Sequence, residues 1–68
     1  MDIKLKLGIK VKALRLERSW SQEKLALNAD IDRTYIPSIE KGERNVSIAI
    51  VEKLANAFNI EIHQLLKF

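Results

Sequence analysis

Residues 21–42, SQEKLALNADIDRTYIPSIEKG, restrict the fold of this chain more than any other stretch. They contain two short helical patterns separated by about four residues, which leaves room only for a sharp turn. Ser21 is placed to cap the first helix and Asp32 the second, because both side chains can accept hydrogen bonds from the N–H groups of a helix start. The apolar residues of the stretch are spaced to face one core: Leu25, Ala26, Ile31, Ile36 and Ile39. The pattern therefore predicts a helix-turn-helix unit.

The polar side chains left on the outside of this unit favour binding to DNA. They are Gln22, Arg33, Thr34 and Ser38. A helix-turn-helix unit that exposes polar side chains on its second helix is typical of proteins that place this helix in the major groove.

Helical periodicity continues through the rest of the 68 residues, and no strand pattern of any length occurs. Helices are predicted over residues 4–18, 22–28, 33–41, 48–58 and 61–67. Further core side chains are expected at Leu7, Val11, Leu14, Ile48, Val51, Leu54, Ala55, Phe58 and Leu65. Five helices joined by short loops predict one compact all-α domain over residues 1–68.

Four residues interrupt the helical regularity and have separate expected roles. Gly8 costs a helix about 1 kcal/mol relative to Ala, and a close approach of another helix is the usual reason to tolerate it. Pro37 lies near the start of the third helix, so we expect a tightened first turn rather than a broken helix. Gly42 and Asn59 are expected in the left-handed conformation that ends a helix.

Composition excludes several classes of protein. The chain has no cysteine, and its one histidine, His63, has no second ligand at a suitable spacing, so no metal site is expected. No Ser-His-Asp arrangement, carboxylate pair or phosphate-binding glycine loop stands out. We therefore expect no enzymatic activity, no cofactor and no small-molecule substrate. Apolar runs are too short for a membrane span and no signal peptide is evident, which favours a cytoplasmic protein.

The charge of the chain suits a polyanionic partner. The formal net charge is +3, and the sequence pI is near 9.5. Residues 1–20 contain six basic and two acidic side chains, so the basic excess lies mostly in the first predicted helix. This face is either solvated surface or a further contribution to DNA affinity.

Three motifs in one order, SQEKLA, YIPSIEKGERNVS and VEKLANAFNI, carry a family resemblance from Leu7 to Leu66. The chain resembles the Cro/repressor (XRE-like) type of helix-turn-helix domain, which implies a five-helix, lambda-repressor-like fold. The segment DRTYIPSIEKGERNVS is also similar to the controller proteins of restriction–modification systems. That resemblance implies a homodimer on a palindromic operator in double-stranded DNA, regulating its own promoter and that of the endonuclease. An antitoxin-type regulator or a phage Cro/repressor-like switch remains as an alternative.

The sequence departs from the family at three helix boundaries. Ser19 and Asp30 stand where the family usually has Gly, and Glu61 stands where it usually has a Ser or Thr cap. We expect these departures to affect stability rather than DNA contacts.

Contacts with the bases are predicted for Arg33, Thr34 and Ser38. Arg33 lies on the exposed first turn of the recognition helix, and arginine can donate bidentately to guanine O6 and N7; otherwise it is a surface residue or a phosphate contact. Thr34 is expected at a thymine methyl group or a phosphate. Contacts with the DNA backbone are predicted for Gln22, Tyr35, Lys41, Arg44, Asn45 and Ser47, with core packing as the alternative for Tyr35. The resemblance further implies a structural ion pair between Arg15 and Glu40.

Four apolar residues are left without an expected buried partner: Ile50, Ile62, Leu66 and Phe68. An exposed apolar patch usually marks an interface, so we expect the C-terminal helices to form a dimer interface. A twofold dimer would place two recognition helices about 34 Å apart, one turn of DNA. The alternative is that the C-terminal helix folds over its own core.

Overall fold

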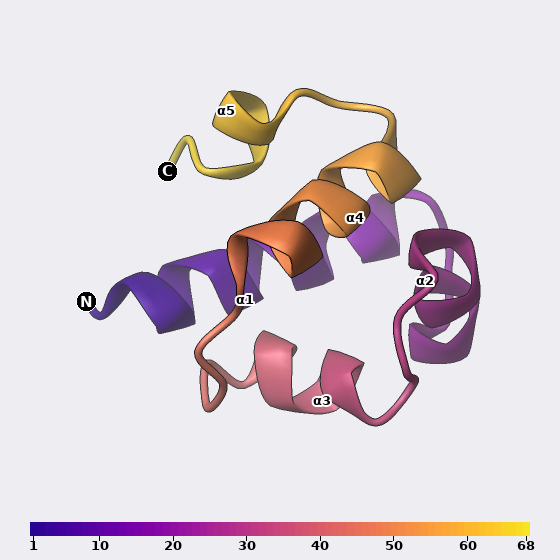
Figure 1. Ribbon diagram of the computed structural model, residues 1–68, viewed down its shortest axis with the longest axis horizontal. Coiled ribbons are helices and arrows are strands. Elements are labelled where there is room, and N and C mark those ends of the chain that lie inside the picture. The colour runs from indigo at the N-terminus through magenta and orange to yellow at the C-terminus, as the bar shows by residue number, and fades with distance from the viewer.

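Five helices and no strands make up the fold, as predicted. The computed structural model describes residues 1–68, and its helices are α1 (Ile3–Glu17), α2 (Gln22–Ala29), α3 (Tyr35–Glu40), α4 (Ile48–Phe58) and α5 (Ile62–Leu65). In Figure 1, α3 lies at the bottom and α5 at the top, with α1 and α4 between them. Helix α1 packs against α3, α4 and α5, whereas α2 packs against α3 and α4. None of the helices is long and apolar enough to cross a membrane.

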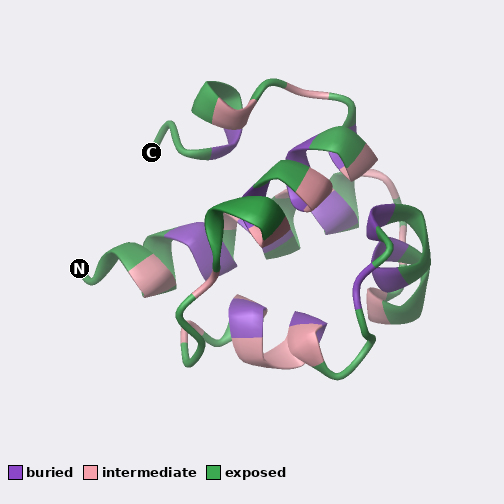
Figure 2. Ribbon diagram, viewed as in Figure 1, coloured by how far each residue is buried: buried purple, intermediate pink, exposed green.

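One apolar core fills the space between the helices (Figure 2). Its largest fully buried side chains are those of Val11, Leu25, Ile36, Ile39, Leu54, Phe58 and Leu65. Leu14 is only half-buried, and it packs against the edge of this core. The prediction that Ile48 belongs to the core is wrong, since this side chain is 75% exposed. Ile48 is the first residue of α4, where the helix has only begun to cover the core.

The start of α3 differs from the predicted start by two residues. Asp32 accepts hydrogen bonds from the backbone N–H of Thr34 at 2.9 Å and from its hydroxyl at 2.7 Å. A short polar side chain bonded in this way holds the backbone in a turn that competes with helix. Asp32 therefore does not cap α3, which begins at Tyr35. The end of α5, at Leu65, also differs from the prediction by two residues, whereas α1 begins one residue early, at Ile3.

The predicted tightened first turn of α3 is present. The N–H of Tyr35 donates to the carbonyl of Asp32 at 3.0 Å, and that of Ile36 to the carbonyl of Arg33 at 3.3 Å. Both bonds span three residues, as in a 3₁₀ turn. Pro37 is the third residue of the helix, where an N–H would have no partner within the helix. Its missing N–H therefore costs no hydrogen bond.

Gly8 lies where α1 touches the backbone of α3, as its position in the helix predicted. A Cβ at residue 8 would lie 2.7 Å from the carbonyl oxygen of Glu40 and closer still to that of Ile39. Only a glycine permits this distance between the two helices.

Four residues have a positive φ, and each follows the end of a helix. Ser19, Asp30 and Asn59 have φ of 57°, 56° and 58°, and Gly42 has φ of 73°. The predictions for Gly42 and Asn59 are confirmed. After α4, the N–H of Ile60 donates to the carbonyl of Ala55 at 3.0 Å, which satisfies a carbonyl that the helix leaves free.

Trp20 covers one edge of the core. Its ring stacks on that of Phe58, with centroids 5.8 Å apart and an interplanar angle of 13°. The guanidinium of Arg18 lies 4.9 Å from the Phe58 ring centroid, and its Nη2 donates to the Phe58 carbonyl at 2.8 Å. Arg18 thus ties the end of α1 to the end of α4.

Candidate nucleic-acid interface

A buried ion pair fixes α3 against α1. Arg15 donates to the two carboxylate oxygens of Glu40, from Nε at 2.7 Å and from Nη2 at 3.0 Å. The two side chains are only 10% and 5% exposed. The remaining nitrogen, Nη1, donates to the carbonyl of Trp20 at 2.8 Å. The ion pair that the family resemblance implied therefore forms, and it sets the position of α3.

The charges of this pair depend on each other. The hydrogen bonds to Glu40 raise the pKa of Arg15, burial acts in the opposite direction, and the negative charge of Glu40 raises the pKa again. The guanidinium of Arg15 is therefore held in its charged form. Removal of either partner would leave the other charge buried and unpaired.

Gln22 belongs to the same cluster. Its Nε2 donates to Oε1 of Glu40 at 3.1 Å, so one carboxylate joins α1, α2 and α3. The prediction that Gln22 points outward is thus only partly right, because the residue is half-buried. A side-chain amide has two N–H donors, and only one of them is used within the protein. One donor therefore remains at the start of α2.

Arg33 and Glu23 face each other across the turn of the motif. Nη1 of Arg33 donates to Oε1 of Glu23 at 2.9 Å, and the side chains are 72% and 73% exposed. Arg33 lies just before α3, in the turn that Asp32 and Thr34 form, rather than on the helix itself. It is nevertheless exposed at the start of the recognition helix, as predicted.

A depression of about 330 Å³ lies between the starts of α2 and α3. It is lined by Gln22, Glu23, Arg33, Thr34 and Pro37, and it contains none of the large apolar side chains. Three of the residues predicted to contact DNA therefore surround one concavity.

Ser38, Tyr35 and Arg44 form a second cluster beside α3. The hydroxyl of Ser38 donates to the Tyr35 carbonyl at 2.9 Å and accepts from Nε of Arg44 at 2.9 Å. The Arg44 guanidinium also lies 4.1 Å from the centroid of the Tyr35 ring. Ser38 is half-buried and its hydroxyl is engaged within the protein, so the prediction that it points outward is only partly right. Tyr35 is half-buried and packs against the core, which is the alternative predicted for this residue. Part of the residue remains exposed, and Arg44 lies over its ring.

The remaining residues predicted to contact the DNA backbone lie in the loop between α3 and α4. Lys41 and Asn45 are exposed. Ser47 is also exposed, and its hydroxyl accepts from the N–H of Ile50 at 3.2 Å, which caps α4. The loop therefore exposes basic and polar side chains to solvent.

Replacing Thr34 with Val is expected to raise the pKa of Asp32. The Thr34 hydroxyl, followed by its backbone N–H, holds the pKa of this carboxyl below its ordinary value of 3.8. A carboxyl whose pKa is lowered by folding adds stability above its unfolded pKa and loses it as pH falls through the folded pKa. The Val variant should therefore lose this contribution at a higher pH, as measured by NMR titration of the Asp32 carboxyl. Thr34→Ser keeps the hydroxyl and should titrate like wild type; an unchanged titration in the Val variant would contradict the assigned cause.

The expected dimer residues divide into two groups. Ile50 and Ile62 are half-buried and pack against the core, so the prediction that they lack buried partners is wrong. Helix α5 packs against α4. Leu66 and Phe68 are 38% and 52% exposed, and these two remain as apolar surface.

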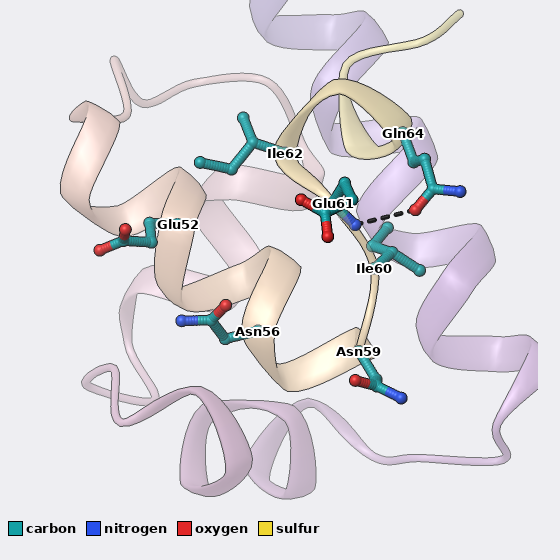
Figure 3. Close-up of a pocket in the computed structure, with 7 residues that line it drawn as sticks. All are labelled: Glu52, Asn56, Asn59, Ile60, Glu61, Ile62 and Gln64. Atoms are coloured by element: carbon teal, nitrogen blue, oxygen red, sulfur yellow. Dashed lines mark hydrogen bonds between the residues drawn. The ribbon is translucent and has the colours of Figure 1, made fainter.

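A polar depression of about 340 Å³ lies on α4 and its connection to α5 (Figure 3). Within it, the backbone N–H of Glu61 donates to Oε1 of Gln64 at 2.8 Å, so Gln64 helps to cap α5 although Glu61 replaces the usual Ser or Thr. The depression holds no cationic side chain, and no group of three or more potential metal ligands occurs anywhere in the structure.

The class of protein follows from this arrangement. Helices α2 and α3 form a helix-turn-helix motif, and a buried ion pair fixes the second helix against a supporting bundle. A family model for the helix-turn-helix matches residues 11–65, and the chain belongs to this family.

Relatives within the family confirm the more specific resemblance. The control protein C.BamHI of Bacillus amyloliquefaciens is 47% identical over 68 residues, which cover 98% of this chain and 84% of the relative. The crystal structure of the restriction-modification controller protein C.AhdI from Aeromonas hydrophila has a TM-score of 0.87 at 40% identity, covering 91% of this chain and 94% of that one. The crystal structure of SinR, a master regulator for biofilm formation, in complex with DNA has a TM-score of 0.83 at 32% identity, covering 90% and 98%.

Proposed function

We propose that this chain is a sequence-specific DNA-binding transcriptional regulator that acts in the cytoplasm as a homodimer on a palindromic operator. Its role is that of a restriction–modification controller, which regulates its own promoter and that of the endonuclease. The observation that carries the proposal is the recognition helix α3, fixed by the buried Arg15–Glu40 pair and preceded by the exposed Arg33 and Thr34. The similarity to control proteins over nearly the whole chain supports the particular role.

Recognition of the bases is assigned to the side chains at the start of α3. Arg33 donates to guanine O6 and N7, and Thr34 contacts a thymine methyl group or a phosphate. Ser38 reaches a base or sugar once Arg44 moves away from its hydroxyl. The turn between Asp32 and Thr34 presents Arg33 and Thr34 at the start of the helix that enters the groove.

Contacts with the phosphates are assigned to both sides of α3. On one side, Gln22 uses its free amide N–H at the start of α2, where the N-terminal end of a helix also attracts anions. On the other side, the contacts come from Tyr35, Lys41, Arg44, Asn45 and Ser47. These contacts hold the protein in register and are independent of base sequence.

Arg33→Ala is expected to weaken binding to the preferred operator by about 1–3 kcal/mol and to relax the preference at one base pair. The reason is the loss of two donors that distinguish guanine from the other bases. Site selection from a random duplex pool, followed by electrophoretic mobility shifts on the selected site, measures both effects. Lys12→Ala, at an exposed lysine of α1, is the matched control and should keep the base preference. An Arg33 variant with unchanged affinity and base preference would remove Arg33 from the base contacts.

Dimerisation is assigned to the C-terminal helices, through the half-buried Ile50 and Ile62 and the exposed Leu66 and Phe68. Leu66→Lys with Phe68→Lys should give a monomer by sedimentation analysis, because two charges would have to be buried at the interface. Both positions are exposed, so the helical content should not change. A dimer that persists in this variant would contradict the assignment.

The genes on either side of the coding sequence test the biological role. A methyltransferase and an endonuclease gene are expected for a controller, whereas a toxin gene would favour the antitoxin alternative. Prophage genes would favour a Cro/repressor-like switch.

A further inference from the structure

The contact between Arg33 and Glu23 leaves most of the guanidinium free. Nη1 of Arg33 donates to Glu23 at 2.9 Å, and Arg33 makes no other side-chain hydrogen bond within the protein. The edge formed by Nε and Nη2 is therefore unoccupied. This edge carries two parallel N–H groups, the geometry that pairs with guanine O6 and N7.

We propose that Glu23 is a positioning residue for DNA sequence specificity: it holds one nitrogen of Arg33 and presents the opposite edge of the guanidinium to a base. The inference rests on the proposed function, because it requires Arg33 to contact a base. Glu23 itself need not touch the DNA. It comes from α2, so the two helices of the motif jointly define the orientation of one side chain.

The contact between Arg33 and Glu23 matters less for folding than for binding. Both side chains are nearly three-quarters exposed, and an exposed ion pair contributes little to folding. A long arginine side chain has many rotamers, however, and an interaction that restricts them before binding lowers the entropy lost in the complex. The restriction favours only those complexes in which the held orientation fits, which are those with guanine in place.

The negative charge of Glu23 weakens sequence-independent binding to DNA, whereas its contact with Arg33 strengthens recognition of a base. Residues 21–44 contain four basic and five acidic side chains, so the motif and the loop after it lack the positive excess of the first helix. A carboxylate at the start of α2 repels nearby phosphates, and phosphate contacts dominate binding to random DNA. Glu23 therefore strengthens base recognition while it weakens contact with the wrong sequence.

The test compares the affinity of Glu23→Ala for the selected operator and for a random duplex of equal length. Operator selectivity, the ratio of the two affinities, should fall by about three- to tenfold, the range that ordering one flexible side chain implies. The loss should be confined to the base pair that Arg33 reads, and affinity for random DNA should not fall. Glu17→Ala removes an exposed carboxylate from α1 and is the charge-matched control, with unchanged selectivity.

Two further variants separate positioning from charge and from folding. Glu23→Gln removes the same charge but keeps an oxygen acceptor for Arg33, so it should retain more selectivity than Glu23→Ala. In an Arg33→Ala background, Glu23→Ala should have no further effect on base preference. Unchanged selectivity in Glu23→Ala, or an equal loss with and without Arg33, would overturn the inference. Thermal unfolding of each variant checks that the fold is intact.

Failure of the proposed function has a different signature. If wild type shows no preference for any selected site, or if Arg33→Ala keeps the full base preference, the base contact itself is absent and the inference falls with it. If Arg33→Ala relaxes the preference and Glu23→Ala does not, only the inference is overturned.

Discussion

Glu40→Ala should lower the free energy of unfolding of this domain by about 3–5 kcal/mol, because it leaves the Arg15 guanidinium buried without its counter-ion. The carboxylate accepts three hydrogen bonds, two from Arg15 and one from Gln22, and it is almost fully buried. The loss is large for a domain of this size, since total stabilities are only about 5–15 kcal/mol. Urea unfolding at constant m-value, or a fall in Tm of about 4–8 °C per kcal/mol, measures it.

Two controls identify the cause of that loss. Glu40→Gln keeps acceptor oxygen but removes the charge, so its stability should lie between those of wild type and the Ala variant. Replacing both partners with apolar residues of similar volume, Arg15→Met with Glu40→Leu, should recover most of the loss, because no charge is then left unpaired. If Glu40→Ala cost less than about 1 kcal/mol, the value typical of exposed pairs, the pair would not be buried as described.

Gly8→Ala is expected to destabilise the domain by about 2 kcal/mol, although helix propensity alone predicts a gain of about 1 kcal/mol. The added Cβ would overlap the backbone carbonyl oxygens of Ile39 and Glu40, and backbone atoms cannot rotate out of the way as a side chain can. The contact between α1 and α3 must therefore widen, which also lengthens the ion pair beside it. Circular dichroism during thermal unfolding measures the effect.

Ala13 provides the reference for this prediction, because it is exposed on the same helix. Ala13→Gly should cost about 1 kcal/mol through propensity alone. A Gly8→Ala variant that is more stable than wild type would mean that α1 and α3 are further apart than the structure shows.

The fold could be predicted because its determinants are local and periodic. The helical spacing of Leu25, Ile36 and Leu54 placed all three in the core, and each has no exposed surface. The start of α3 was predicted wrongly because an aspartate at this position can either cap a helix or hold the backbone in a turn. Here Thr34 donates two hydrogen bonds to Asp32, and the turn that they form delays the helix. Ile48 was misplaced because periodicity gives the face of a helix and not how far along it the core extends.

The sequence predicted which types of residue form the site, but it predicted few of the contacts between them. The Arg15–Glu40 pair spans 25 residues of sequence, and only the family resemblance brought the two together. Glu23 had no sequence signal beyond its place at a helix start, because its partner lies ten residues away across the turn. The bonds from Ser38 to Tyr35 and Arg44 likewise depend on how a loop folds back, which spacing alone does not define.

Ser19 and Asp30 hold left-handed backbone conformations that glycine adopts at no steric cost. Both residues are exposed, and neither is among those assigned to DNA. Ser19→Gly and Asp30→Gly are therefore routes to a more robust domain that leave its recognition surface intact. For protein engineering, stability can therefore be raised at these two turns without changing the residues that choose the DNA sequence. A variant stabilised there could accept new residues at the start of α3 that would unfold the natural chain.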